Sequence, residues 1–222
     1  MDESTDWDDQ KLRRLKAIFD GDGTEIREQF IYAGLLLTIF ERFKIYAVNQ
    51  VDGFFSNHIE FKGGEPKYKR HEEFKKLIKE HGNGQLGKHN NHAFRAALQW
   101  FHDCGAIDAE ELDEVERLYT LRNEIGHELL LILAQDGKQP ITIYDVLLAF
   151  NVYVKTVRWW WREVECATDP DMTKEKYDST DWDEVESIDT MLLREIMNKA
   201  LRENPVWQDI QNTAMEAGGK QS

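Results

Sequence analysis

The sequence predicts an all-α protein, and three features of the chain support this fold class. Long stretches carry apolar residues at intervals of three and four, which is the repeat of an amphipathic helix. Alternation of Val and Thr, typical of half-buried strands, is scarce, and only four prolines occur in 222 residues. Hydrophobic residues make up 41% of the chain. A chain of this length and composition can bury one sizeable core or form one domain with appendages.

The composition also predicts a soluble protein of the cytoplasm with no membrane partner. The longest apolar run, residues 30–40, ends at Glu41 and is shorter than the roughly 20 residues that a bilayer crossing needs. The first ten residues are acidic, unlike the start of a secretory signal. Cys104 and Cys166 lack the spacing of metal ligands. We therefore expect no metal and no cofactor.

The first half of the chain divides into helices separated by glycine-rich breaks. We expect residues 1–23 to form an acidic lead-in with a short helix at 11–19, and Thr24 to cap a long helix that follows. The predicted elements after it are the long helix to about residue 57, a break at 63–66, a basic helix at about 68–81, a loop at 82–89 and a helix from 90 or 91 to 105.

The second half contains the best-defined helix start of the sequence. Asp108 and Glu111 form a capping-box pair, which predicts a helix to about residue 134. Thr142 with Asp145 predicts the next helix, to about residue 166. Two helices joined by a short turn pack antiparallel, so we expect an up-down bundle over residues 24–166. Residues 167–222 are predicted to be an acidic loop followed by additional helices at about 188–203 and 205–216.

The most informative motif is the hexapeptide Arg-Asn-Glu-Ile-Gly-His at residues 122–127. Arg122 shares a helical stripe with apolar residues, and an unpaired buried charge is costly, so the arginine needs a partner or a polar cleft. Asn123 and His127 are four residues apart and lie on an adjoining face. A cation, an amide and an imidazole on one helix can bind a phosphate and move a proton.

This motif resembles the signature of the HEPN superfamily, in which an Arg, often followed by Asn, precedes a His by four to six residues. The resemblance covers about residues 25–165 and implies a compact helical bundle. Many members are metal-independent endoribonucleases that act as toxins or in phage defence, with RNA as substrate and an antitoxin or defence-system partner. They commonly form homodimers in which two motifs face one cleft.

By this resemblance, His127 is the general acid or base and Arg122 grips the scissile phosphate. Asn123 binds the phosphate or holds the histidine, and Gly126 permits close approach of a backbone or phosphate. The family members silenced by AMP transfer carry a tyrosine two residues after the histidine, whereas this chain has Leu129. That form of regulation is therefore excluded.

Three alternatives remain open at the level of sequence. In the first, Arg122 makes a buried ion pair, for example with Glu41, Asp52 or Glu128, while His127 is a core histidine. In the second, the chain is a purely structural dimerisation module, in which Arg122→Ala mainly destabilises the fold. Alternatively, a HEPN-like module binds a nucleotide or a protein without catalysis, which the net charge of −14 favours.

Two further segments carry candidate ligand-binding residues. Residues 62–95 have a net charge of +5 within the acidic chain and can steer an anion. The loop at residues 82–89 resembles a phosphate-binding loop in its glycine and lysine positions but lacks the preceding strand. It leaves Lys88, His89 and His92 as candidate contacts to RNA. In the run Trp159-Trp160-Trp161, one indole is expected to face away from the local core.

Overall fold

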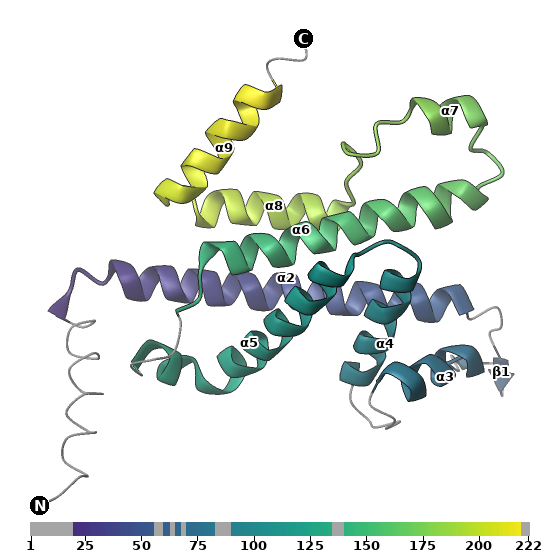
Figure 1. Ribbon diagram of the computed structural model, residues 1–222, viewed down its shortest axis with the longest axis horizontal. Coiled ribbons are helices and arrows are strands. Elements are labelled where there is room, and N and C mark those ends of the chain that lie inside the picture. The colour runs from purple at the N-terminus through teal and green to yellow at the C-terminus, as the bar shows by residue number, and fades with distance from the viewer. Residues whose placement is uncertain are drawn as a thin grey trace, which may run out of the picture. The chain divides into compact units, whose positions relative to one another are not determined.

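The computed structural model describes residues 20–55, 60–62, 65–67, 70–82, 90–134 and 140–218, and it confirms the all-α class (Figure 1). Within these residues, no helix combines the length and apolar content that a bilayer crossing requires. The elements are α2 (Thr24–Phe55), strands β1 (Glu60–Lys62) and β2 (Glu65–Lys67), α3 (Glu72–His81), α4 (Asn90–Asp103), α5 (Ala109–Ala134), α6 (Ile143–Trp160), the π-helical turn η1 (Trp161–Cys166), α7 (Lys174–Ser179), α8 (Ile188–Ala200) and α9 (Pro205–Gly218).

The start of α5 is the capping box that the sequence predicts. The backbone N–H of Glu111 donates to Asp108 Oδ1, and the backbone N–H of Asp108 donates to Glu111 Oε2, both at 2.9 Å. Each side chain thereby satisfies a backbone donor that the helix itself leaves without a partner. Lys155 Nζ lies 2.6 Å from Glu111 Oε2, so a side chain of α6 is attached to this cap.

The predicted cap of α6 is also confirmed, whereas that of α2 is wrong. The backbone N–H of Thr142 donates to Asp145 Oδ2 at 2.8 Å, and the N–H of Asp145 donates to the Thr142 hydroxyl at 3.3 Å. At α2, Thr24 is the first helical residue, and its N–H donates to Asp22 Oδ1 at 2.9 Å. Gly23 turns the chain between them with a φ of 76°, a conformation that favours glycine.

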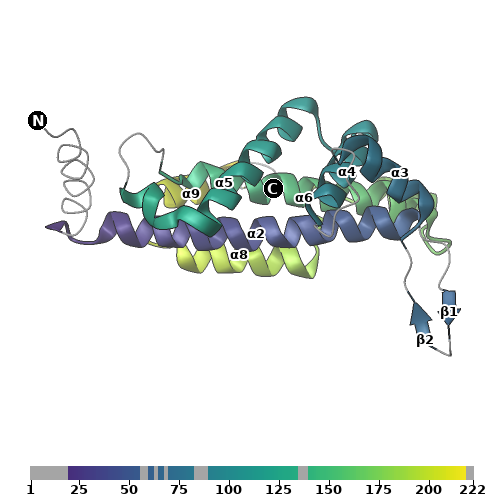
Figure 2. The ribbon, with the colours of Figure 1, turned by 90° about the horizontal axis from the view of Figure 1, so that it is seen from below.

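Three segments differ from the prediction. Helix α7 lies in the acidic stretch after residue 167 that was expected to be a loop. The break after α2 contains an antiparallel hairpin in which Glu60 pairs with Lys67 (Figure 2). The basic helix α3 therefore begins at Glu72, later than expected, and packs against α4. The predicted helix at residues 11–19 lies outside the described residues.

Two of the long helices depart from α-helical geometry near their C-terminal ends. The helix that was expected to reach residue 166 ends in the π-helical turn η1, where the indole N–H of Trp160 donates to Glu165 Oε1 at 2.9 Å. A spacing of five residues suits the π-helical repeat. In α5, Glu128 has φ −135° and ψ 24°, so the helix kinks directly after His127.

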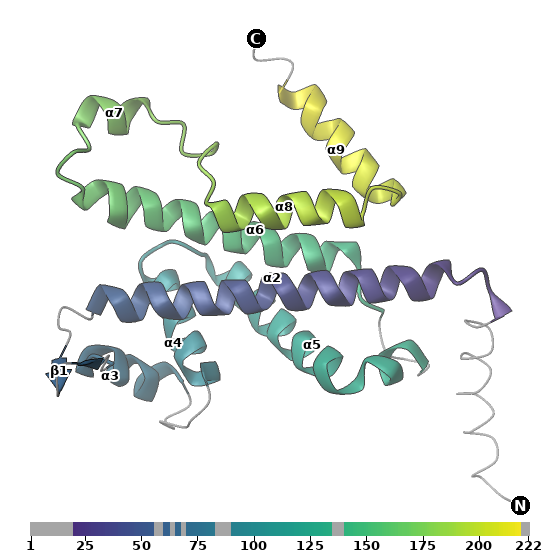
Figure 3. The same ribbon diagram turned by 180° about the vertical axis from the view of Figure 1, so that it is seen from behind.

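The chain forms two compact units, and each takes part of the three long helices. The first contains the described parts of residues 1–39, 117–150 and 187–222. Here Gln29 of α2 exchanges two hydrogen bonds with the backbone of Ile141, at 2.8 and 3.0 Å. The guanidinium of Arg194 on α8 lies 5.2 Å from the ring centre of Phe150, where α8 runs beside the first half of α6 (Figures 1 and 3). The predicted segment boundaries at residues 23 and 166 stay a prediction.

The second unit contains the described parts of residues 40–116 and 151–186 and has an aromatic core. Trp160 is buried among Trp100 and Phe101 of α4, with ring centres 6.1 Å apart in both pairs. Trp161 is 43% exposed, which confirms that one indole of the tryptophan run faces away from the core.

Candidate functional site

The hexapeptide occupies the last regular turns of α5 before the kink at Glu128. The capping box fixes the start of this helix four turns earlier, and Val115 and Leu118 bury its inward face. All residues of the motif belong to the first unit. The structure therefore places the motif at the end of a well-anchored helical segment, as the sequence predicts, but it adds a break that the sequence did not reveal.

Arg122 and Asn123 form a directly bonded pair. Arg122 Nη1 donates to the amide oxygen of Asn123 at 3.0 Å, and both side chains are half-buried. This bond joins consecutive residues, so it orients the guanidinium along the helix surface. A guanidinium has five N–H donors in a planar fork, a geometry that suits contact with an amide oxygen or a phosphate. Asp52, one of the partners that the sequence suggests for Arg122, pairs with a different arginine: Arg70 Nε lies 3.1 Å from Asp52 Oδ2.

His127 and Gly126 are both exposed to solvent. The alternative of a core histidine is therefore wrong, and the imidazole is accessible to a ligand. A Cβ placed on Gly126 would meet no atom within 4 Å, so the space beside the histidine is open. This openness is what close approach of a phosphate or of a second chain requires.

Helical geometry keeps Arg122 and His127 on different sides of α5. Five residues at 100° each separate their directions by about 140°, and the kink comes too late to change this angle. The structure thus joins the arginine to Asn123 and leaves the imidazole on another part of the helix surface. A single chain does not gather all three groups around one point.

Two of the predicted contacts, Lys88 and His89, lie outside the described residues. The basic helix α3 belongs to the second unit, and its side chains are partly paired: Lys75 Nζ lies 2.6 Å from Glu72 Oε1. In the part of the chain that the structure describes, no group of three His, Cys, Asp or Glu side chains is arranged to hold a metal ion.

A hollow next to the motif is a feature that the sequence did not predict. It has a volume of about 440 Å³ and is lined by α5 and by the segment that leads into α6, with Thr120, Glu124 and Pro140 among its residues. An ion pair forms one side, because Arg117 Nη1 donates to Asp145 Oδ1 at 2.8 Å. Glu124 lies three residues before His127, so the hollow adjoins the imidazole face of the helix.

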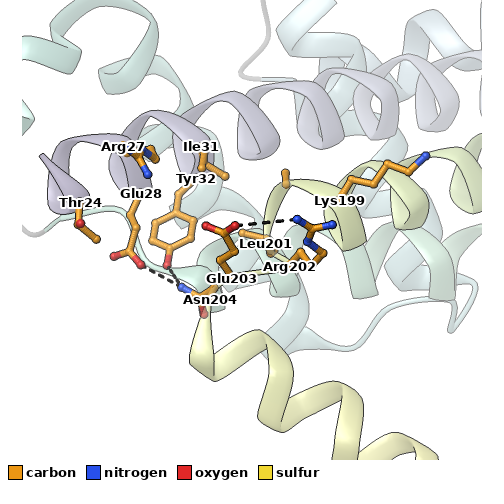
Figure 4. Close-up of a pocket in the computed structure, with 11 residues that line it drawn as sticks. Thr24, Arg27, Glu28, Ile31, Tyr32, Lys199, Leu201, Arg202, Glu203 and Asn204 are labelled. Atoms are coloured by element: carbon orange, nitrogen blue, oxygen red, sulfur yellow. Dashed lines mark hydrogen bonds and ion pairs between the residues drawn. The ribbon is translucent and has the colours of Figure 1, made fainter.

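A second hollow of about 390 Å³ lies between the first turns of α2 and the turn from α8 to α9 (Figure 4). At its centre the amide of Asn204 donates to the Tyr32 hydroxyl at 2.7 Å and to Glu28 Oε1 at 3.2 Å. The Asn204 oxygen accepts from the backbone N–H of Trp207 and caps α9. Burial raises the pKa of Tyr32, and the charge of Glu28 adds to this effect.

The only local sequence signal for this second hollow was the Asn-Pro pair at 204–205, which is typical of a helix start. The wall opposite Asn204 contains Glu28 and Tyr32, which lie 176 and 172 positions away in sequence, so no local pattern could reveal the cavity.

No family model, curated protein or solved structure matches this chain.

Proposed function

We propose that this chain is a metal-independent endoribonuclease of the HEPN type that acts through Arg122, Asn123 and His127. The observation that carries the proposal is the exposure of His127 on the helical segment that also holds the bonded Arg122–Asn123 pair. An imidazole is suited to proton transfer near neutral pH, and such a group contributes roughly 10²–10⁴-fold to a rate.

In the proposed reaction, the ribose 2′-oxygen attacks the adjacent phosphorus and the bond to the 5′-oxygen of the next nucleotide breaks. His127 takes the 2′-hydroxyl proton or supplies a proton to the leaving oxygen. Arg122 binds the scissile phosphate and stabilises the charge that develops there. Asn123 holds the guanidinium in place through its amide oxygen. The products are a 2′,3′-cyclic phosphate and a free 5′-hydroxyl.

Cleavage of RNA in EDTA tests this reaction. Wild type is compared with His127→Ala and Arg122→Ala, and His81→Ala is the matched control because His81 is an exposed histidine on another helix. We expect wild type and His81→Ala to cleave with 2′,3′-cyclic phosphate ends, and both motif variants to be inactive while circular dichroism shows them folded. Cleavage by folded His127→Ala at the wild-type rate would refute the assignment.

The angle of about 140° between Arg122 and His127 supports a homodimer in which each active site takes the arginine of one subunit and the histidine of the other. Mixing inactive Arg122→Ala with inactive His127→Ala then restores activity. Random exchange makes half of the dimers mixed, and each mixed dimer has one intact site of two, so about a quarter of wild-type activity is expected. No recovery after subunit exchange contradicts a shared site.

A non-catalytic binding module is the second candidate, and the charge of α5 favours it. This helix carries seven Asp and Glu residues against two arginines, which disfavours contact with a polyanion. In that case the Arg122–Asn123 pair contacts a nucleotide or a partner protein. The two candidates differ in the EDTA assay: a folded wild type that cleaves none of a varied RNA set supports the binding module.

The proposed cellular role, a toxin or phage-defence effector controlled by an antitoxin or defence-system partner, depends on the family resemblance. Growth arrest on expression of wild type, relieved by His127→Ala at equal protein level, supports this role. Normal growth during expression of the active enzyme argues against a toxin.

A further inference from the structure

Helix α8 has two apolar faces, and only one of them is covered. Thr190, Leu193 and Met197 are buried. Four large apolar side chains on the other side are exposed: Ile188 by 77%, Met191 by 55%, Leu192 by 57% and Ile196 by 48%. In a regular helix the centres of these two sets lie roughly 160° apart. We call the exposed set the α8 outer face.

An exposed stripe of this kind marks a surface that binds another chain segment. Scattered single apolar residues are ordinary on protein surfaces, but four at spacings of three, four and eight residues along one helix form a continuous strip. The question is which segment occupies the α8 outer face.

We propose that residues 11–19 of the same chain bind the α8 outer face. These residues lie outside the described part of the chain, and their sequence, Lys-Leu-Arg-Arg-Leu-Lys-Ala-Ile-Phe, has a complementary pattern. Leu12, Leu15 and Phe19 are spaced by three and four residues and share one face of a helix. Three apolar positions of this segment thus correspond to Ile188, Leu192 and Ile196.

The position of the start of α2 places this segment within reach of α8. Thr24, Arg27 and Glu28 line a hollow together with residues 199–204, and the amide of Asn204, in the turn that follows α8, donates to Glu28 Oε1 at 3.2 Å (Figure 4). The described chain thus enters α2 beside the turn that follows α8, and only residues 20–23 separate this point from the segment. Nine helical residues span about 13.5 Å, and the eight residues between Ile188 and Ile196 span about 12 Å.

The charges favour an arrangement in which the segment and α8 run in the same direction. Residues 11–19 contain four basic residues and no acidic one, and the basic residues are concentrated at 11–16. The sequence that leads into α8, residues 181–189, contains five acidic residues and no basic one. One of them, Asp189, lies in the first turn of α8. If Phe19 lies near Ile196, Lys11 lies near this first turn. Gly23, with its φ of 76°, allows the chain to reverse between the segment and α2.

Disulfide trapping tests this proposal in the full chain. In a Cys104→Ser, Cys166→Ser background, Leu15→Cys with Leu192→Cys should form an intramolecular disulfide under mild oxidation, visible as a faster-migrating monomer on a non-reducing gel. Arg14→Cys with Leu192→Cys is the matched control, because position 14 faces the other side of a helical segment. The control pair should remain reduced.

Tryptic cleavage at Arg13 and Arg14 provides the second measurement. Leu192 is exposed, so Leu192→Asp leaves the fold intact, and it should speed cleavage at these arginines about tenfold by releasing the segment. Disulfide-linked dimers would show that a second copy occupies the α8 outer face. That result would overturn the proposal. Equal disulfide formation in the two cysteine pairs, or an unchanged rate of tryptic cleavage in Leu192→Asp, would also overturn it.

Discussion

Replacement of Gly126 by alanine separates the stability of α5 from the use of the space beside His127. A Cβ at this position meets no atom within 4 Å, and the same holds at Gly34 in α2. A glycine inside a helix costs about 0.5–1 kcal/mol relative to alanine because of its larger backbone entropy when unfolded. Each substitution should therefore stabilise the protein by about that amount.

For a chain of this size, about 1 kcal/mol corresponds to roughly 2–4 °C in the unfolding midpoint. Thermal unfolding followed by circular dichroism should show both Gly126→Ala and Gly34→Ala melting above wild type. RNA cleavage should fall in Gly126→Ala alone, because its methyl group occupies the space that the proposed phosphate or partner chain approaches. An unfolding midpoint of Gly126→Ala below that of wild type would refute the inference that the space at position 126 is open. RNA cleavage by Gly126→Ala at the wild-type rate would refute the inference that the substrate uses this space.

Three further substitutions or modifications have outcomes that the structure defines. Gly82→Ala should lower the free energy of unfolding, measured by urea titration, by about 1–3 kcal/mol. The reason is that its Cβ would lie 2.5 Å and 2.8 Å from two backbone carbonyl oxygens that cannot move easily. An unfolding midpoint equal to that of wild type would show that the backbone where α3 ends and α4 begins rearranges freely. Asn204→Ala should lower the free energy of unfolding by about 1–2 kcal/mol, since it removes the cap of α9 and the donor to the buried Tyr32 hydroxyl. Because the two residues interact, Tyr32→Phe should destabilise the Asn204→Ala variant less than it destabilises wild type. Burial, with a smaller contribution from the Asp103 charge, raises the pKa of the Cys104 thiol. Alkylation of this thiol by iodoacetamide should therefore reach half its maximal rate at a higher pH than alkylation of glutathione does. Asp103→Asn should lower that pH, and an unchanged pH would exclude the carboxylate as a cause.

The features predicted correctly from the sequence are those that depend on residues close together in the chain. The boxes at Asp108–Glu111 and Thr142–Asp145 are bonds over three residues, and their geometry follows once a helix begins there. The kink at Glu128 and the π-helical turn after Trp160 could not be predicted, because the spacing of apolar residues indicates a helix but not an interruption of its regular geometry. The hairpin at 60–67 was missed because its strands are only three residues long.

The candidate site was predictable in its composition and not in its arrangement. The helical repeat gives the positions of Arg122, Asn123 and His127 around α5, but it gives neither the bond between the first two nor the exposure of the third. Side-chain pairing and solvent exposure depend on neighbours from other parts of the chain. The hollow between α2 and the turn from α8 to α9 shows the same limit, since its walls join segments that are far apart in sequence.

The kink at Glu128 has a consequence for how easily a chemical reagent reaches His127. In a straight helix, side chains lean toward the N-terminus, so positions three and four residues later would extend over the imidazole. Glu128 departs from helical geometry, so the regular helix is interrupted directly after the histidine. We expect a substitution that restores helical geometry at position 128 to slow acylation of His127 by diethylpyrocarbonate without altering any group of the motif.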